Sequence, residues 1–147
     1  YINMYISLES FTMQIVPEAY RDLVSDTSKA IAYLSTTLKS GAPVTAPIWF
    51  GVRDDHICFV SSPESLKVKN MVARLAVSLL IQDPDVVYRY IQIRGTYSKD
   101  MKESAIEFLH MLSNRYIGKG YPTELGGDDV IVYIKPERVN VFTWDAG

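Results

Sequence analysis

One short stretch of the chain concentrates hydroxyl and lysine side chains between a strand-like run and a helix-like run. It spans Phe59 to Asn70 and reads FVSSPESLKVKN. Its hydroxyls belong to Ser61, Ser62 and Ser65, and its lysines are Lys67 and Lys69. The free N–H groups and positive dipole end of a helix N-terminus favour an anion such as phosphate, and a lysine adds a full charge. A serine-capped helix with solvated lysines produces the same pattern. Both interpretations are open at this point.

The other chemically capable residues form no recognisable constellation. His56 and His110 are the only histidines, and neither has zinc-ligand spacing to Cys58 or to an acidic pair. The serines lack a G-x-S-x-G elbow, and Gly126-Gly127 lacks the lysine of a phosphate-binding loop. We therefore predict no metal site and no serine nucleophile.

Composition sets the broad class. The chain has 147 residues, 48% of them hydrophobic and 22% charged, which is typical of one soluble globular domain. The net charge of −2 and the scattered basic residues argue against nucleic acid or an anionic membrane as a partner. Because Cys58 is the only cysteine and no apolar run approaches about 20 residues, we expect a cytoplasmic protein. We treat residues 1–12 as a tail or an added segment of a single domain spanning 1–147.

Hydrophobic periodicity predicts a mainly β chain with flanking helices. Strands are expected over residues 30–38, 43–52, 56–60, 75–81 and 87–97, with one or two more over 130–144; helices are expected over 16–24, 66–73 and 101–116. The apolar run 75–81 suggests a strand buried on both faces, or nearly so, and Lys99-Asp100 suggests a helix cap. The loop 116–121 either covers a site or only ends a helix, and we favour the second. Short antiparallel connections indicate a barrel or a sandwich.

Four segments carry a family resemblance when they are taken in order. They are 32–36 with 40–43, 46–50, 61–70 and 90–96. Together they resemble the flavin-binding split-barrel proteins related to pyridoxamine 5′-phosphate oxidase, in the branch that includes F420-dependent and FMN-dependent oxidoreductases. The resemblance implies a six-stranded antiparallel split β-barrel that forms a homodimer. It also implies an oxidoreductase, with FMN or F420 at the dimer interface carrying hydride transfer to a small molecule.

The resemblance assigns roles to nine residues of the chain. Lys67 is implied as the main phosphate partner, with Ser61, Ser62 and Ser65 as donors and with Lys69 and Asn70 as weaker candidates on the same helix. Pro47 and Trp49 lie on the strand beside the ring system, although Trp49 also suits the barrel core. Gln92 alternates onto the same strand face as Tyr90 and Arg94, so one of these three could reach a ring edge, and Gln92 is the candidate that we name.

Two departures from the family pattern argue against the vitamin B6 reaction itself. Pyridoxamine phosphate oxidases carry an arginine where this chain has Leu66, and they end in a substrate-gripping segment that residues 141–147 do not match. An alternative of another class is a non-enzymatic split-barrel module that binds flavin or haem. A third is a structural barrel without a ligand.

Overall fold

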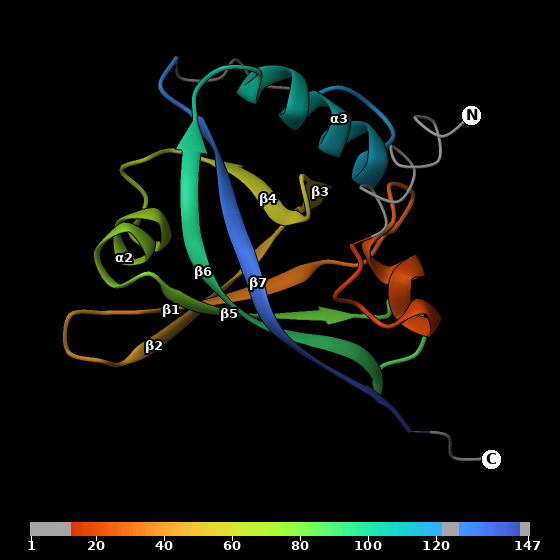
Figure 1. Ribbon diagram of the computed structural model, residues 1–147. Coiled ribbons are helices and arrows are strands. Elements are labelled where there is room, and N and C mark those ends of the chain that lie inside the picture. Colours follow the sequence, from red (N-terminus) through yellow and green to blue (C-terminus); the bar gives the residue numbers. More distant parts are fainter. Residues whose placement is uncertain (1–12, 122–126, 145–147) are drawn as a thin grey trace, which may run out of the picture.

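The computed structural model describes residues 13–121 and 127–144, so the predicted tail lies outside the described residues. Seven antiparallel strands form one strongly curved sheet in the order β2-β1-β5-β6-β7-β4-β3 (Figure 1). The strands are β1 (Ala32–Thr37), β2 (Pro43–Ile48), β3 (Gly51–Arg53), β4 (His56–Ser61), β5 (Ala76–Gln82), β6 (Arg89–Met101) and β7 (Val130–Thr143). The helices are the 3-10 helix η1 (Glu18–Val24), α2 (Leu66–Arg74) and α3 (Ala105–Ile117).

The predicted count of six strands is wrong, because the expected strand 43–52 is two strands. Trp49 and Phe50 lie between these two strands, and the pairing partner changes there. β2 pairs with β1, whereas β3 pairs with β4. Both residues at this break are apolar, so the sequence pattern looks like one continuous strand. In the structure Phe50 is fully buried and Trp49 packs under α3. The described sheet therefore ends at β2 and at β3 and does not close.

Two boundaries and the burial of one strand also differ from the predictions. β6 continues through Lys99-Asp100, and α3 begins only after Ser104, whose φ of 64° turns the chain. Of the one or two strands predicted over 130–144, the structure has one, β7, since a register shift opposite Gly95 accommodates the extra residue Glu137. β5 alternates between buried and half-exposed residues, so it is covered on one face of the monomer and not on both.

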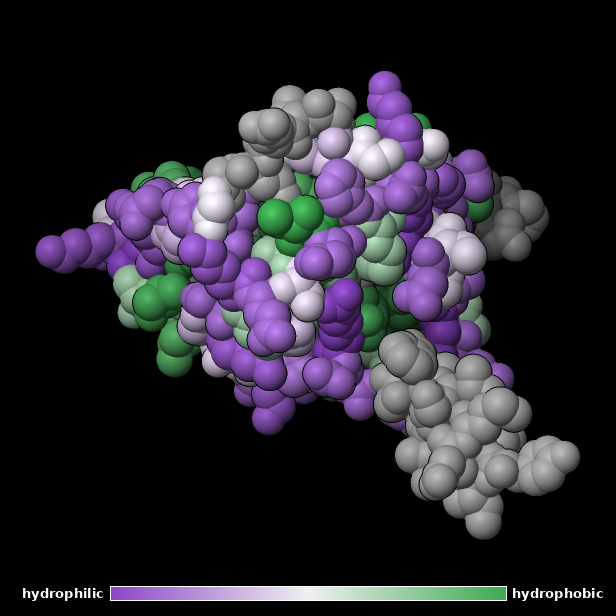
Figure 2. All heavy atoms as spheres, turned by 90° about the horizontal axis from the view of Figure 1, so that it is seen from above, coloured by the Kyte–Doolittle hydropathy of each residue, from purple (hydrophilic) through white to green (hydrophobic). Residues whose placement is uncertain are grey.

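Two hydrophobic clusters hold the elements together. The larger fills the concave side of the sheet and includes Phe50, Phe59 and Met71. The smaller lies under α3, where Phe108 and Leu112 pack against residues of β4 and β7. Viewed from above, the face that α3 covers is mostly hydrophilic (Figure 2). α3 is thus amphipathic and turns its apolar side to the sheet.

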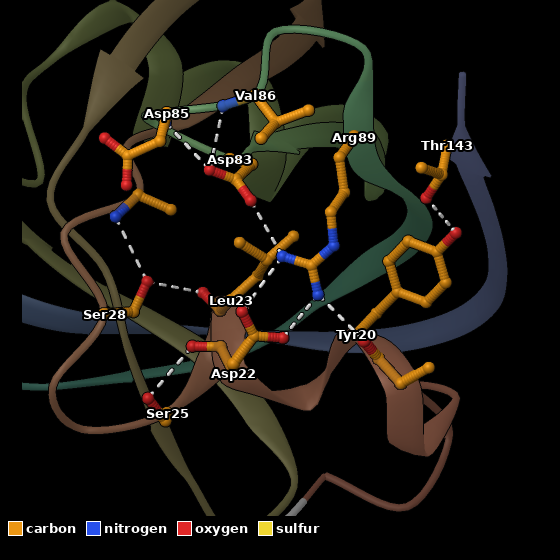
Figure 3. Close-up of polar contacts among 12 residues, drawn as sticks. Tyr20, Asp22, Leu23, Ser25, Ser28, Asp83, Asp85, Val86, Arg89 and Thr143 are labelled. Carbon is orange, nitrogen blue, oxygen red and sulfur yellow. Dashed lines mark hydrogen bonds and ion pairs between the residues drawn. The ribbon is translucent and has the colours of Figure 1, made fainter. Parts of the chain in front are cut away.

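An ion-pair cluster fastens η1 to the turn between β5 and β6 (Figure 3). The guanidinium of Arg89 donates to both carboxylate oxygens of Asp22, at 2.6 and 2.9 Å, and to Asp83 at 2.8 Å. It also donates to the carbonyl of Ala19 at 2.8 Å. Nearby, the Tyr20 hydroxyl hydrogen-bonds Thr143 on β7. These contacts tie a segment early in the chain to strands β6 and β7 and to the turn between β5 and β6.

Candidate functional site

Two adjoining hollows meet at Lys67. The larger, about 320 Å³, is lined by Pro47, Ile48, Trp49, Val60, Lys67, Leu109, Leu112 and Tyr121. The smaller, about 190 Å³, is lined by Leu34, Thr36, Val44, Thr45, Ala46, Leu66 and Lys67. Three of the predicted site residues, Pro47, Trp49 and Lys67, are therefore brought to one place.

The N-terminus of α2 is left open for an anion. Ser65 is the N-cap, yet its side chain makes no capping bond, because its hydroxyl lies 3.0 Å from the hydroxyl of Ser61. The first turn contains no acidic residue. The first N–H groups of any α-helix have no intrahelical partner, and at α2 the Ser65 side chain does not cap them. Lys67 stands in this turn half-buried, and within the described part of the chain it makes no ion pair.

The other two polar candidates on this loop and helix are engaged locally. The hydroxyl of Ser62 accepts the N–H of Glu64 at 3.2 Å. Lys69 forms an ion pair with Glu64 at 3.0 Å, and both side chains are largely exposed. Lys69 is therefore directed toward solvent, away from the two hollows that Lys67 lines.

Asn70 lies in the contact between α2 and the sheet. Its side chain is buried, donates to the hydroxyl of Thr36 at 3.1 Å and accepts from Arg74 at 2.8 Å. Arg74 in turn donates to the carbonyl of Thr37 at 2.6 Å. With both ends of its amide bonded, Asn70 holds α2 against β1 and so positions Lys67.

The indole of Trp49 forms part of the hollow and part of the smaller cluster. It stacks on Tyr116 of α3 with ring centroids 5.5 Å apart and an interplanar angle of 12°. The Tyr116 hydroxyl donates to the carbonyl of Ala30 at 2.7 Å, and burial raises the pKa of Tyr116. Because the indole of Trp49 is held by this stack, it forms a fixed part of the wall of the larger hollow. The two sequence interpretations, core residue and ring contact, are compatible here.

Gln92 is not brought to the hollows within one chain. It is exposed on β6, opposite Leu80, which is itself opposite Tyr33, and Tyr33 is opposite Pro47. Three strand spacings of about 4.8 Å put Gln92 roughly 14 Å from Pro47 across the sheet.

Sequence reasoning missed the contribution of α3. Leu109, Leu112 and Tyr121 line the larger hollow, and the backbone N–H of Tyr121 donates to His110 Nδ1 at 3.0 Å. The apolar spacing of α3 signalled only a core face. The loop after α3 ends the helix and also places Tyr121 in the lining of the larger hollow.

Other site types find no support in the described residues. Over residues 13–121 and 127–144, no three histidine, cysteine or acidic side chains are grouped to hold a metal ion. None of the helices in this part of the chain has the length and apolarity needed to cross a bilayer.

Comparison with known proteins places the chain in a family. Solved structures similar to it include an F420 reductase (28% identity, TM-score 0.74, covering 85% of this chain and 98% of that one). Another is a conserved hypothetical protein from Mycobacterium tuberculosis (23% identity, TM-score 0.67, covering 87% of this chain and 85% of that one). A third is an FAD-binding protein from Mesorhizobium loti (19% identity, TM-score 0.60, covering 84% of this chain and 92% of that one). The last two show the fold alone.

The split-barrel prediction is thereby confirmed, with seven strands in place of six. No curated protein sequence matches the chain. The family model described as pyridoxamine 5′-phosphate oxidase matches residues 16–142. The chain therefore belongs to the pyridoxamine 5′-phosphate oxidase family.

Proposed function

We propose that this protein is an oxidoreductase that uses FMN or F420, with the cofactor phosphate at the N-terminus of α2 and the ring system along Pro47 and Trp49. One observation carries the proposal: Lys67 stands in the shared wall of two hollows, next to a helix N-terminus without a side-chain cap. The likeness to an F420 reductase supports the redox class and makes F420 the first cofactor to test.

The residues present suit such a ligand. The Lys67 ammonium and the first N–H groups of α2 would bind the phosphate by charge-assisted hydrogen bonds. The flat indole of Trp49 and the side chains of Leu109 and Leu112 would shape an apolar wall that excludes water from the ring. The cofactor would supply the hydride chemistry, which is why the chain needs no acid or base of its own for that step.

A homodimer is part of the proposal, and the outer face of the sheet is the surface that supports it. Tyr33 and Leu80 are cross-strand neighbours on this face beside Gln92. Farther along, Tyr90 stacks on Phe142, which is 44% exposed. A second copy packed here would cover these apolar groups and would bring Gln92 toward a cofactor bound to the other copy.

Cofactor titration of matched lysine variants tests the site. We expect saturable binding of F420 or of FMN, followed by absorbance, and a tenfold to hundredfold loss of affinity in Lys67→Ala, as for a charged hydrogen bond. Lys69→Ala is the matched control, because it removes the same charge from the same helix at a solvent-facing position. Equal affinities for Lys67→Ala and the parent protein would place the phosphate elsewhere.

Turnover separates the enzyme from a binding module. Bound F420 or FMN should be reduced or reoxidised catalytically when a reduced nicotinamide or reduced F420 is supplied with an acceptor. Binding without turnover would indicate a module that stores or senses its ligand. If neither cofactor binds, the oxidoreductase proposal fails and haem becomes the next ligand to try.

A further inference from the structure

Two arginines lie directly opposite each other in the middle of the sheet. Arg94 on β6 and Arg138 on β7 are cross-strand partners, so both side chains project from the same face, and both are exposed. Like charges in this position repel and destabilise a sheet unless an anion lies between them. Within the described part of the chain, neither guanidinium has an ion-pair or hydrogen-bond partner.

Hydroxyl groups extend this arginine pair across three more strands. Ser78 of β5 is opposite Arg94, Ser35 of β1 is opposite Ser78, and Thr45 of β2 is opposite Ser35. Directly paired residues share a face, so these side chains form one polar row on the outer side of the sheet. The hydroxyls of Ser35 and Thr45 are 2.8 Å apart, which orders that end of the row.

A β-bulge adjoins the arginine pair. The register shifts between Arg94 and Gly95, and Glu137 is left without a cross-strand partner. Gly95 lies so close to the opposite strand that an added Cβ would come within 2.4 Å of the Lys135 carbonyl oxygen. Bulges of this kind redirect neighbouring side chains and recur beside binding sites.

The row borders a hollow of about 450 Å³, which is larger than either hollow at Lys67. Four residues of the row line it: Ser35, Ser78, Arg94 and Arg138. Thr36 and Thr37 at the end of β1 and Thr96 within β6 also line it. Glu137 is the carboxylate in its lining. Lys67 does not line it, although Thr36 belongs both to this hollow and to the smaller one at Lys67.

We propose that this hollow, which we call the arginine hollow, binds the phosphate or carboxylate group of a small molecule between Arg94 and Arg138. Two planar guanidinium groups offer paired N–H donors that match the oxygens of such an anion. Ser78 and Ser35 add neutral donors along the row. Lys67 does not line this hollow, so the arginine hollow is a second site beside the proposed cofactor site. It lies on the outer face of the sheet that carries Tyr33, Leu80 and Gln92, so in the proposed homodimer it would be enclosed between the two copies.

Inorganic phosphate is the probe that tests the arginine hollow. Phosphate is titrated into the isotope-labelled protein while the side-chain Nε–Hε NMR signals of Arg94 and Arg138 and the amide of Ser78 are followed, with sodium chloride at matched ionic strength as the blank. We expect saturable shifts of these signals. R94Q and R138Q should each weaken binding about tenfold, as for loss of a charge-assisted bond.

Three variants sharpen the test. E137Q should tighten phosphate binding, because it removes the carboxylate from the lining. K102Q removes one positive charge from an exposed residue between β6 and α3 and should leave binding unchanged. K67A should also leave it unchanged while it weakens FMN or F420, so failure of the cofactor proposal and failure of this one are distinguishable.

Two results would overturn the proposal. One is the absence of saturable shifts, or equal weakening by R94Q and K102Q, which would indicate general screening. The other is a lower dimer content of R94Q and R138Q in sedimentation velocity without any phosphate effect, which would assign the arginines to a contact between two copies of the chain.

Discussion

Replacing Arg89 with methionine should lower the free energy of unfolding by about 2 kcal/mol at neutral pH. Methionine keeps most of the aliphatic stem and removes the charged head that joins η1 to the β5–β6 turn. The side chain of Arg89 is only 19% exposed and that of Asp83 only 13%, so this ion pair is poorly screened by solvent. Asp22 is 63% exposed, and its share of the loss should be small.

The size of the expected loss in unfolding free energy depends on which hydrogen bonds Asp22 and Asp83 keep after the substitution. A charge-assisted bond contributes about 1.5–3 kcal/mol, whereas an exposed pair contributes about 0.5. After the substitution, Asp83 still accepts the backbone N–H groups of Asp85 and Val86 at 2.8 and 3.1 Å, so its carboxylate is not stranded. That places the expected loss near the lower end of the range, and corresponds to a fall in Tm of about 5 °C for a chain of this size.

The loss should depend on pH in a defined direction. The hydrogen bond from Arg89 is the main reason why the pKa of Asp22 lies below its ordinary value. Burial acts to raise the pKa of Asp83, but hydrogen bonds from Arg89, Asp85 and Val86 together outweigh it and lower that pKa. Lowered carboxyl pKa values stabilise the fold above the unfolded pKa of about 4, and this contribution disappears as the pH falls through the folded values. Arg89 itself stays charged, because hydrogen bonding to Asp22 and Asp83 raises its pKa.

Urea unfolding of the parent, R89M, D83N and the double variant at pH 7 and at pH 3 measures these quantities. D83N and R89M should couple by more than 1 kcal/mol at pH 7, and the difference between the parent protein and R89M should shrink at pH 3. D22N serves as the comparison for an exposed partner and should cost less than about 1 kcal/mol. A loss below about 0.5 kcal/mol at pH 7, within the range of an exposed pair, or an undiminished loss at pH 3, would show that the cluster is not a stabilising contact.

Three further substitutions or reagents probe other parts of the fold. Burial raises the pKa of the Cys58 thiol to about 12. A thiol reagent should therefore leave the native protein unmodified and react only after unfolding in urea, and fast labelling of the native protein would contradict the burial. Gly95→Ala should destabilise the protein by about 1–3 kcal/mol, because the new methyl group would clash with the backbone of the opposite strand. Gly127→Ala has open space around the new methyl group and should lose little stability. Equal losses of stability in thermal unfolding would show that the clash is not the cause. Tyr116→Phe should cost about 1 kcal/mol through the lost bond to Ala30 and should keep the stack on Trp49, so an unchanged urea midpoint would count against that bond.

Local pattern was enough to predict most elements and the region of the site. The strand ending at Ser61 and the helix from Leu66 were predicted because alternation, a serine-rich turn and a helical period follow one another there. The same pattern placed Lys67 and Lys69 at the start of the helix, and the family resemblance singled out Lys67. Its meeting with Pro47 and Trp49 in one hollow agrees with the expectation that the family resemblance supplied, while the binding roles of all nine residues stay predictions.

The remainder depended on contacts distant in sequence. Nothing local separates Ile48 from Gly51 as members of different strand pairs, because Trp49 and Phe50 are as apolar as a continuous strand requires. Asn70 looked like a ligand donor on a helix turn, but Thr36, 34 residues earlier, takes its amide. The pairing of Arg94 with Arg138 likewise appears only when the register of two strands is known.

Strand β2 has a consequence for how the protein behaves in concentrated solution. It forms one edge of the described sheet and contains prolines at positions 43 and 47. Each proline removes an N–H donor that an added strand would need, so another chain cannot extend the sheet along the whole of β2. The same two residues therefore protect this edge from strand-to-strand aggregation, and Pro47 does so where the edge borders the larger hollow at Lys67. Without these prolines, the free edge beside the proposed ligand site would expose N–H donors to which a strand of another chain could bind.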